Sequence, residues 1–99
     1  MKCNEILTPL VQVNTDFSGA DLRGASLEDT SMDGAFLKNA NAAGAYFSAS
    51  LLDAKSLENA DFTDAALPTK TQILICQRDD VKGNNPVTGV DTRDSLMCP

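Results

Sequence analysis

Histidine and tryptophan are absent from this 99-residue chain, and tyrosine occurs once. The absence of histidine excludes histidine-based acid–base catalysis, histidine triads and histidine metal sites. The chain has no tryptophan or tyrosine platform for stacking bases, and its formal net charge of −6 disfavours contact with phosphate backbones, so we expect no nucleic-acid partner. We identify no catalytic, cofactor-binding or metal-ligating residues, and we predict that the protein is not an enzyme and needs no cofactor.

Long apolar runs are also missing, and cysteines are few. No run of 18 or more apolar residues is present, so we expect no membrane insertion. The first five residues lack the apolar stretch of a signal peptide, which predicts either a cytoplasmic protein or a processed or trimmed form. The three cysteines, Cys3, Cys76 and Cys98, contain no C-x-x-C pair, and an odd number leaves at least one thiol unpaired.

The chain does contain a period of five residues, which runs over residues 15–69. Of eleven consecutive units, all except the one centred on Ala42 carry a large apolar residue at the central position, and ten carry a small residue two positions earlier. A period of five fits neither an amphipathic helix nor an alternating strand, so the backbone must turn the same way every five residues. The predicted core residues are Phe17, Leu22, Leu27, Met32, Leu37, Phe47, Leu52, Leu57, Phe62 and Leu67.

The small and the large residue of each unit are two positions apart, so both can point to one side of an extended segment. Glycine or asparagine often follows, at the position where the chain must turn a corner. Units such as Ala20–Gly24 and Ala60–Asp64 resemble the A-[DN]-[LF]-x-x unit of pentapeptide-repeat proteins. The resemblance implies an all-β fold, a right-handed quadrilateral β-helix with twenty residues per coil and just under three coils. Residues twenty apart should then stack, as in Phe17–Leu37–Leu57.

Two units depart from the pattern. Ala42 leaves a gap that the ring of Phe62 should fill, because a void of that size costs roughly 1 kcal/mol. Lys55 occupies a position that is otherwise small and inward-facing. Either its ammonium extends past the end of the solenoid toward Asp79 or Asp80, or the register slips locally by one residue.

Both ends of so short a solenoid would expose core residues and strand edges, so we expect both to be covered. Thr69–Gln72 fits a capping box and predicts a short helix over about 70–80. We divide the chain into an N-terminal lid, a β-helix and a C-terminal helix with a cap: residues 1–14, 15–69 and 70–99.

Two cysteines belong to the C-terminal region. We expect Cys3 at the opposite end of the solenoid, too far for a bridge that needs Cα atoms within about 7 Å. A Cys76–Cys98 disulfide would contribute roughly 3 kcal/mol. The alternative is two buried free thiols, as in a reducing cytosol. The role of Cys3 stays open.

A second resemblance covers the end of the chain. Leu74–Arg78 followed by Asn85–Cys98 is similar to the C-terminal region of pentapeptide-repeat proteins of the plant and cyanobacterial thylakoid lumen. This resemblance implies an oxidising location in the thylakoid lumen of a chloroplast or cyanobacterium, and a Cys76–Cys98 disulfide. Such proteins carry a targeting peptide as precursors, and this chain shows none.

We therefore expect a non-enzymatic structural or protein-interaction module with an unidentified protein partner. Phe36, Tyr46 and Leu51 are apolar in outward columns and form the candidate partner surface, although scattered apolar surface residues are also ordinary. One alternative is a redox response through the Cys76–Cys98 disulfide. Another is an inhibitor of a topoisomerase, since some pentapeptide-repeat proteins mimic B-form DNA and inhibit DNA gyrase. The short solenoid and the spread of its acids over all four faces disfavour that alternative.

Overall fold

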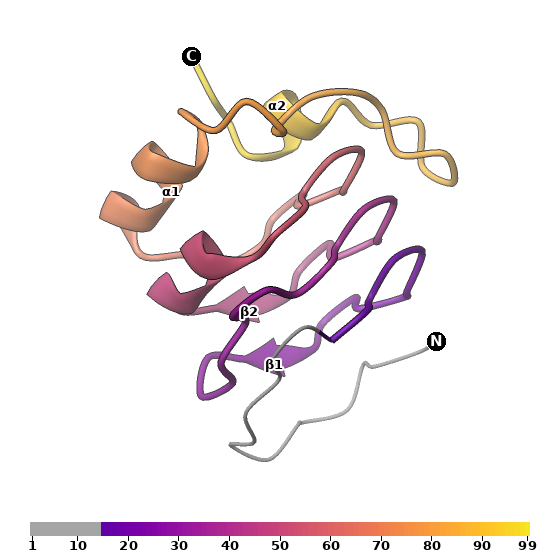
Figure 1. The fold of residues 1–99 in the computed structure, drawn as a ribbon. Coiled ribbons are helices and arrows are strands. Elements are labelled where there is room, and N and C mark those ends of the chain that lie inside the picture. The colour runs from indigo at the N-terminus through magenta and orange to yellow at the C-terminus, as the bar shows by residue number, and fades with distance from the viewer. Residues whose placement is uncertain (1–14) are drawn as a thin grey trace.

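The repeats wind into stacked coils, and residues 70–99 lie against one end of the stack (Figure 1). The computed structural model describes residues 15–99, so the predicted lid over 1–14 and Cys3 lie outside the described residues. Parallel bridges join residues that are twenty positions apart, the spacing that the resemblance to pentapeptide-repeat proteins implies. The fold is a β-helix solenoid. The bridges outside named strands are Asp16↔Phe36, Phe36↔Ser56, Asp21↔Asn41, Asn41↔Asp61 and Tyr46↔Ala66.

Regular elements are few because each side of the coil stays extended for only a few residues before it turns. β1 (Ser26–Leu27) and β2 (Tyr46–Phe47) form a two-stranded parallel sheet. The 3₁₀ helix η1 (Ala49–Asp53) replaces an extended side in the second coil. Two short helices, α1 (Thr69–Ile75) and α2 (Thr92–Ser95), follow the repeats. The handedness of the solenoid and its number of coils stay predictions.

The inward columns of the solenoid form its core. The rings of Phe47 and Phe62 meet edge-on on neighbouring sides, with centroids 5.7 Å apart. Ala42 is fully buried, and whether the ring of Phe62 fills the space beside it stays a prediction. Leu67 packs against the core but is only partly buried. Of the predicted core residues, those that are at most 2% exposed are Phe17, Leu22, Leu27, Met32, Leu37, Phe47, Leu57 and Phe62.

The corners require a left-handed backbone conformation. Gly24 and Gly44 each have a φ of 70° there, which glycine adopts without a steric penalty. Asn39 and Asn59 take the same conformation at the next corner, with φ values of 64° and 62°; asparagine is among the few other residues that tolerate it. The side-chain amide of Asn59 also donates to Oδ1 of Asn39 at 3.1 Å. Asparagine therefore links successive coils at the corner that it turns.

The register slips by one residue in the second coil, and this corrects two predictions. Leu51, not Leu52, points into the core: Leu51 is fully buried, and Leu52 is only partly buried. The cause is η1, in which the N–H of Leu51 donates to the carbonyl of Ser48 and tightens the chain. The large apolar residue therefore reaches the core one position early. The placement of Leu51 on the surface and of Leu52 in the core was wrong.

The same slip settles the position of Lys55. Ala54, 5% exposed, fills the small inward slot, and Lys55 is exposed. The N–H groups of Lys55 and Ser56 both donate to the carbonyl of Ala35, at 2.7 and 3.4 Å, so the extra residue is absorbed as in a β-bulge. The one-residue slip is confirmed, and the extension toward Asp79 or Asp80 is wrong.

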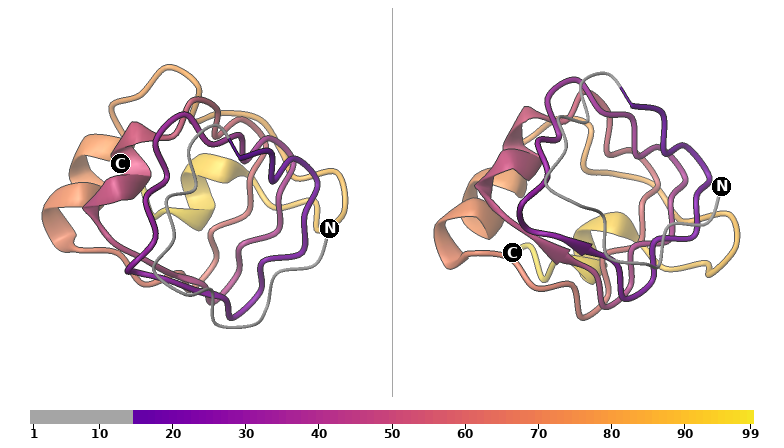
Figure 2. Two further views of the ribbon diagram at one scale, coloured as in Figure 1. Left: turned by 60° about the horizontal axis from the view of Figure 1, so that its bottom comes forward. Right: turned by 90° about the horizontal axis from the view of Figure 1, so that it is seen from below.

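The C-terminal helices cover different parts of the solenoid. α1 packs beside η1, whereas α2 lies across the end of the last coil (Figures 1 and 2). The capping box at the start of α1 is wrong, because Pro68 is the N-cap and no side chain caps the helix. α1 also ends at Ile75, earlier than predicted. No helix within residues 15–99 is long and apolar enough to cross a membrane.

Candidate functional site

Residues 76–99, called the C-terminal segment below, continue the hydrogen-bond ladder beyond the last coil. Inside the solenoid, the N–H of a central residue donates to a carbonyl of the next coil, as Leu37 does to Ser56 at 2.8 Å. For three N–H groups of the last coil, the C-terminal segment supplies the acceptor instead, and these contacts fix its position. They are Leu57 N–H to Asp80 Oδ2 (2.9 Å), Asn59 N–H to the Lys82 carbonyl (3.0 Å) and Phe62 N–H to Ser95 Oγ (3.0 Å).

Asn85 fastens the C-terminal segment to a corner of the solenoid. Its amide nitrogen donates to the carbonyls of Ala40 and Asn59, both at 3.0 Å. Its Oδ1 accepts the N–H groups of Val87 and Thr88 at 2.9 and 3.0 Å. The residue is 2% exposed, so a buried amide has both polar atoms satisfied, as burial requires. The sequence analysis gave Asn85 no individual role and missed this one.

The end of the chain is held by a disulfide and by separate hydrogen bonds. The sulfur atoms of Cys76 and Cys98 are 2.06 Å apart in a disulfide, with Cα atoms 5.5 Å apart. Nε2 of Gln72 donates to the carbonyl of Leu96 at 2.7 Å. Nη1 of Arg93 donates to the carbonyl of Cys76 at 2.9 Å. The segment therefore has several anchors that do not depend on sulfur chemistry.

An ion pair supports the segment where it leaves α1. Nε and Nη2 of Arg78 donate to the two carboxylate oxygens of Asp80, at 2.9 and 2.7 Å. Burial alone would raise the pKa of Asp80, but the hydrogen bonds from Arg78 and from the N–H of Leu57 outweigh it, so the pKa is lowered. Asp80 is therefore an ionised acceptor that holds the edge of the last coil.

Several other described carboxylates take part in local hydrogen bonds and ion pairs. Burial would raise the pKa of Asp61, but the hydroxyl and N–H of Thr63 donate to it and the pKa is lowered on balance. Asp61 is thus a satisfied structural acceptor. No group of three or more cysteine or acidic side chains within residues 15–99 could hold a metal ion. On the surface, Asp21 pairs with Arg23 at 2.8 Å, and Glu58 pairs with Lys38 at 3.6 Å, so bases interrupt the acids.

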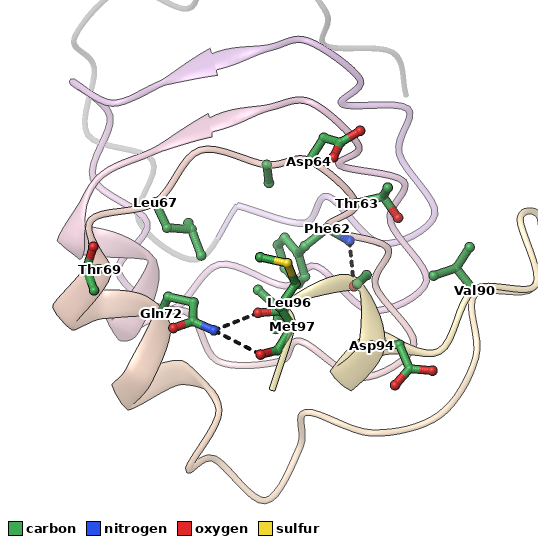
Figure 3. A pocket seen from close by; sticks show the side chains of 12 residues that line it. Phe62, Thr63, Asp64, Leu67, Thr69, Gln72, Val90, Asp94, Leu96 and Met97 are labelled. Carbon is green, nitrogen blue, oxygen red and sulfur yellow. Dashed lines mark hydrogen bonds between the residues drawn. The ribbon is translucent and has the colours of Figure 1, made fainter. Parts of the chain in front are cut away.

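A groove of about 480 Å³ lies between the last coil and the C-terminal segment (Figure 3). Phe62, Ala65 and Leu67 line it from the coil, and Leu96 and Met97 line it from the segment. Met97 is 81% exposed. The groove is therefore mainly apolar, and it is bounded by two parts of the chain that other contacts hold in place.

The structure does not bring the three predicted partner-surface residues together. Leu51 belongs to the core, and Phe36 is partly buried, with Nζ of Lys55 5.6 Å from the centroid of its ring. Tyr46 is 47% exposed and forms a bridge with Ala66, which is also exposed. Phe36 and Tyr46 are ten positions apart, half a coil of twenty, so they lie on opposite sides. Of the three, Tyr46 shares a side of the solenoid with the groove.

Comparison with known proteins identifies the family. The family model described as pentapeptide repeats (8 copies) matches residues 13–48. The crystal structure of a pentapeptide repeat protein from the thylakoid lumen of Arabidopsis thaliana is 30% identical, with a TM-score of 0.52, and the match covers 94% of this chain and 70% of that one. The chain is a pentapeptide repeat protein.

A second relative of this pentapeptide repeat protein is also lumenal. The chloroplastic thylakoid lumenal protein TL20.3 of Arabidopsis thaliana is 43% identical over 47 residues. That match spans 48% of this chain but only 16% of TL20.3. Both relatives are thylakoid lumenal proteins, and neither match indicates a catalytic family.

Proposed function

We propose that this pentapeptide repeat protein is a non-enzymatic interaction module of the thylakoid lumen that binds a protein partner. The scaffold is a right-handed, four-sided solenoid of just under three coils, with residues 70–99 as its C-terminal cap. The lumenal location of the two relatives supports a location of this protein in the thylakoid lumen. The observation that carries the proposal is the side of the solenoid that bears Tyr46 and Ala66, called the Tyr46 side below.

The Tyr46 side combines exposed apolar groups with a rigid backbone. The N–H of Tyr46 donates to the carbonyl of Ala25, and the N–H of Ala66 donates to the carbonyl of Ala45, both at 2.8 Å. A tyrosine ring on a rigid sheet supplies contact area with little loss of side-chain entropy and a hydroxyl for hydrogen bonding. The apolar groove continues the same side at the last coil. These features suit a protein interface.

A redox response is the second candidate function. Cys98 is only partly buried, so the disulfide lies at the margin of the core. Hydrogen bonds from Gln72 and Arg93 hold the same part of the chain independently of the disulfide. Reduction of the disulfide would therefore change the fold little, which favours a purely structural role for it. Its reduction potential is the decisive measurement, since structural disulfides lie near or below about −300 mV.

The proposed function is tested by affinity capture from thylakoid lumen extract. The Tyr46→Ser variant is compared with Phe36→Ser, a matched aromatic-to-serine change on the opposite side. We expect Tyr46→Ser to lose the partner that the parent chain and Phe36→Ser retain, with both variants giving the circular dichroism spectrum of the parent. Capture of the same proteins by Tyr46→Ser would refute the assignment to this side.

A further inference from the structure

The last coil leaves part of its backbone without hydrogen-bond partners where the Tyr46 side meets the groove. Beyond Phe62, whose N–H is bound by Ser95, the next donors of the ladder are the N–H groups of Asp64 and Leu67. Neither has a partner in the described part of the chain, and the carbonyl of Ala65 between them has none either. We call Asp64–Leu67 the open edge.

One coil below, the equivalent groups are all paired. The N–H of Ala66 donates to the carbonyl of Ala45 at 2.8 Å, and its carbonyl accepts the N–H of Phe47 at 2.9 Å. The carbonyl of Thr63 accepts the N–H of Gly44 at 2.8 Å. The open edge presents the same order of donor, acceptor and donor. A parallel extended chain can therefore add to it in the register that the solenoid already uses.

The inward-facing side chains of the Tyr46 side are also partly exposed to solvent at the open edge. Ala45 and Phe47 are 0% and 2% exposed, whereas Ala65 and Leu67, which stack on them, are only partly buried. In the same coil, Phe62 is 1% exposed beneath the C-terminal segment. A residue paired with the open edge would send its two neighbours into the groove. By analogy with the repeat, the first would be small and the second leucine or phenylalanine.

The rim of the groove specifies the charge of the occupant. Asp64 and Asp94 line it, and no lysine or arginine of residues 15–99 does. Both aspartates are exposed, so a cationic side chain can reach them from solvent. A basic segment therefore fits this edge better than an acidic one.

We propose that the open edge binds an extended, basic peptide segment of a partner protein by parallel β-strand addition. The segment carries a small residue and, two positions later, a leucine or phenylalanine, whose side chains enter the groove. This inference rests on the proposed function, because it names the partner chemistry for the same side of the solenoid.

The probe is a fluorescein-labelled peptide, Lys-Ala-Lys-Leu-Lys with blocked ends, titrated against the intact chain by fluorescence anisotropy. The matched probe is methylated on the backbone nitrogen of the central lysine, which removes the N–H that the carbonyl of Ala65 accepts. We expect methylation to weaken binding by about tenfold or more, since it leaves a buried acceptor unpaired. Ala65→Leu, which fills the groove, should have a similar effect. Ala49→Leu, the same change in η1, should have none.

Bound peptide should also slow hydrogen exchange at the amides of Asp64 and Leu67 by about tenfold or more. The proposal is overturned if the peptide does not bind at millimolar concentration, or if the methylated peptide binds equally well. The proposal would also be overturned if two copies of the chain associate through the open edge and the peptide cannot displace one of them. If the peptide fails but Tyr46→Ser still loses its lumenal partner, the proposed function stands and only the open edge is rejected. If the peptide binds but Tyr46→Ser keeps its partner, the open edge is supported and the assignment of the partner to Tyr46 is rejected.

Discussion

The side-chain amide of Asn85 donates a 3.0 Å hydrogen bond to the carbonyl of Ala40, 45 positions earlier in the chain. The same nitrogen donates to the carbonyl of Asn59 in the last coil. One side chain of the C-terminal segment thus bridges two successive coils at a corner. This contact and the ladder contacts of Asp80 and Ser95 place the segment so that it covers part of the last coil and leaves the open edge uncovered.

We predict that Asn85→Ala lowers the free energy of unfolding by about 2 kcal/mol, because the carbonyl of Asn59 loses its hydrogen-bond donor and two N–H groups of the C-terminal segment lose their acceptor. The carbonyl of Ala40 still accepts the N–H of Asp61 at 3.0 Å. Asn85→Asp should cost more at pH 7, since a carboxylate cannot donate and would face the carbonyl oxygens of Ala40 and Asn59. Urea denaturation measures both. Asn84→Ala, at the exposed neighbouring position, is the control and should cost well under 1 kcal/mol. Equal losses for Asn84→Ala and Asn85→Ala would contradict the role of Asn85.

Removal of the disulfide should destabilise the protein without unfolding it. Cys98→Ser opens a bridge that spans 22 positions, and we expect a loss of about 3 kcal/mol. The circular dichroism spectrum should persist, because Gln72 and Arg93 still hold the chain end. Reductant should lower the melting temperature of the parent chain and leave that of Cys98→Ser unchanged. If reductant left the melting temperature of the parent chain unchanged, the disulfide would contribute nothing to stability.

The stability contributed by Asp80 depends on pH in a defined direction. Its pKa in the folded chain is lowered, below an unfolded value of about 3.9. Its contribution is therefore complete above the unfolded pKa and is lost as the pH falls through the folded pKa. Asp80→Asn should lower stability at pH 7 and flatten the decline below about pH 4. Asp79→Asn, at the exposed neighbour, should leave the curve unchanged; an Asp80→Asn curve parallel to that of the parent would refute this assignment.

The register slip gives a comparison between two adjacent leucines. Leu51→Ala should cost about 3 kcal/mol, because it leaves a cavity in the core. Leu52→Ala should cost about 1 kcal/mol, because Leu52 is only partly buried. Chemical denaturation of the two variants measures the difference. A larger loss for Leu52→Ala than for Leu51→Ala would contradict the register slip and support an uninterrupted period of five.

The period of five predicted the inward columns from Phe17 to Phe47 because each coil repeats the same local geometry. It could not fix the register at Leu51 and Leu52, since two adjacent leucines satisfy either alignment. The misplaced lysine at position 55 was the one local signal of the slip. The roles of Asn85 and Asp80 follow from contacts between distant parts of a region without a period, so no local pattern predicts them.

The candidate site was predictable only in part. The resemblance to lumenal proteins indicated the pairing of Cys76 with Cys98. The exposure of Tyr46 follows from its outward column. The open edge does not follow from any motif, because it depends on where the C-terminal segment stops covering the last coil. Leu67 fits the repeat as well as Leu27 does, and only the fold shows that its N–H has no partner in the described chain.

The most direct test of this account is residue-resolved amide hydrogen exchange of the parent chain, followed by NMR. The amides of Leu57, Asn59 and Phe62, which donate to the C-terminal segment, should be protected. The amides of Asp64 and Leu67 should exchange about 100-fold faster. A Leu67 amide protected as strongly as that of Phe62 would show that the last coil is closed on this side and would contradict the open edge.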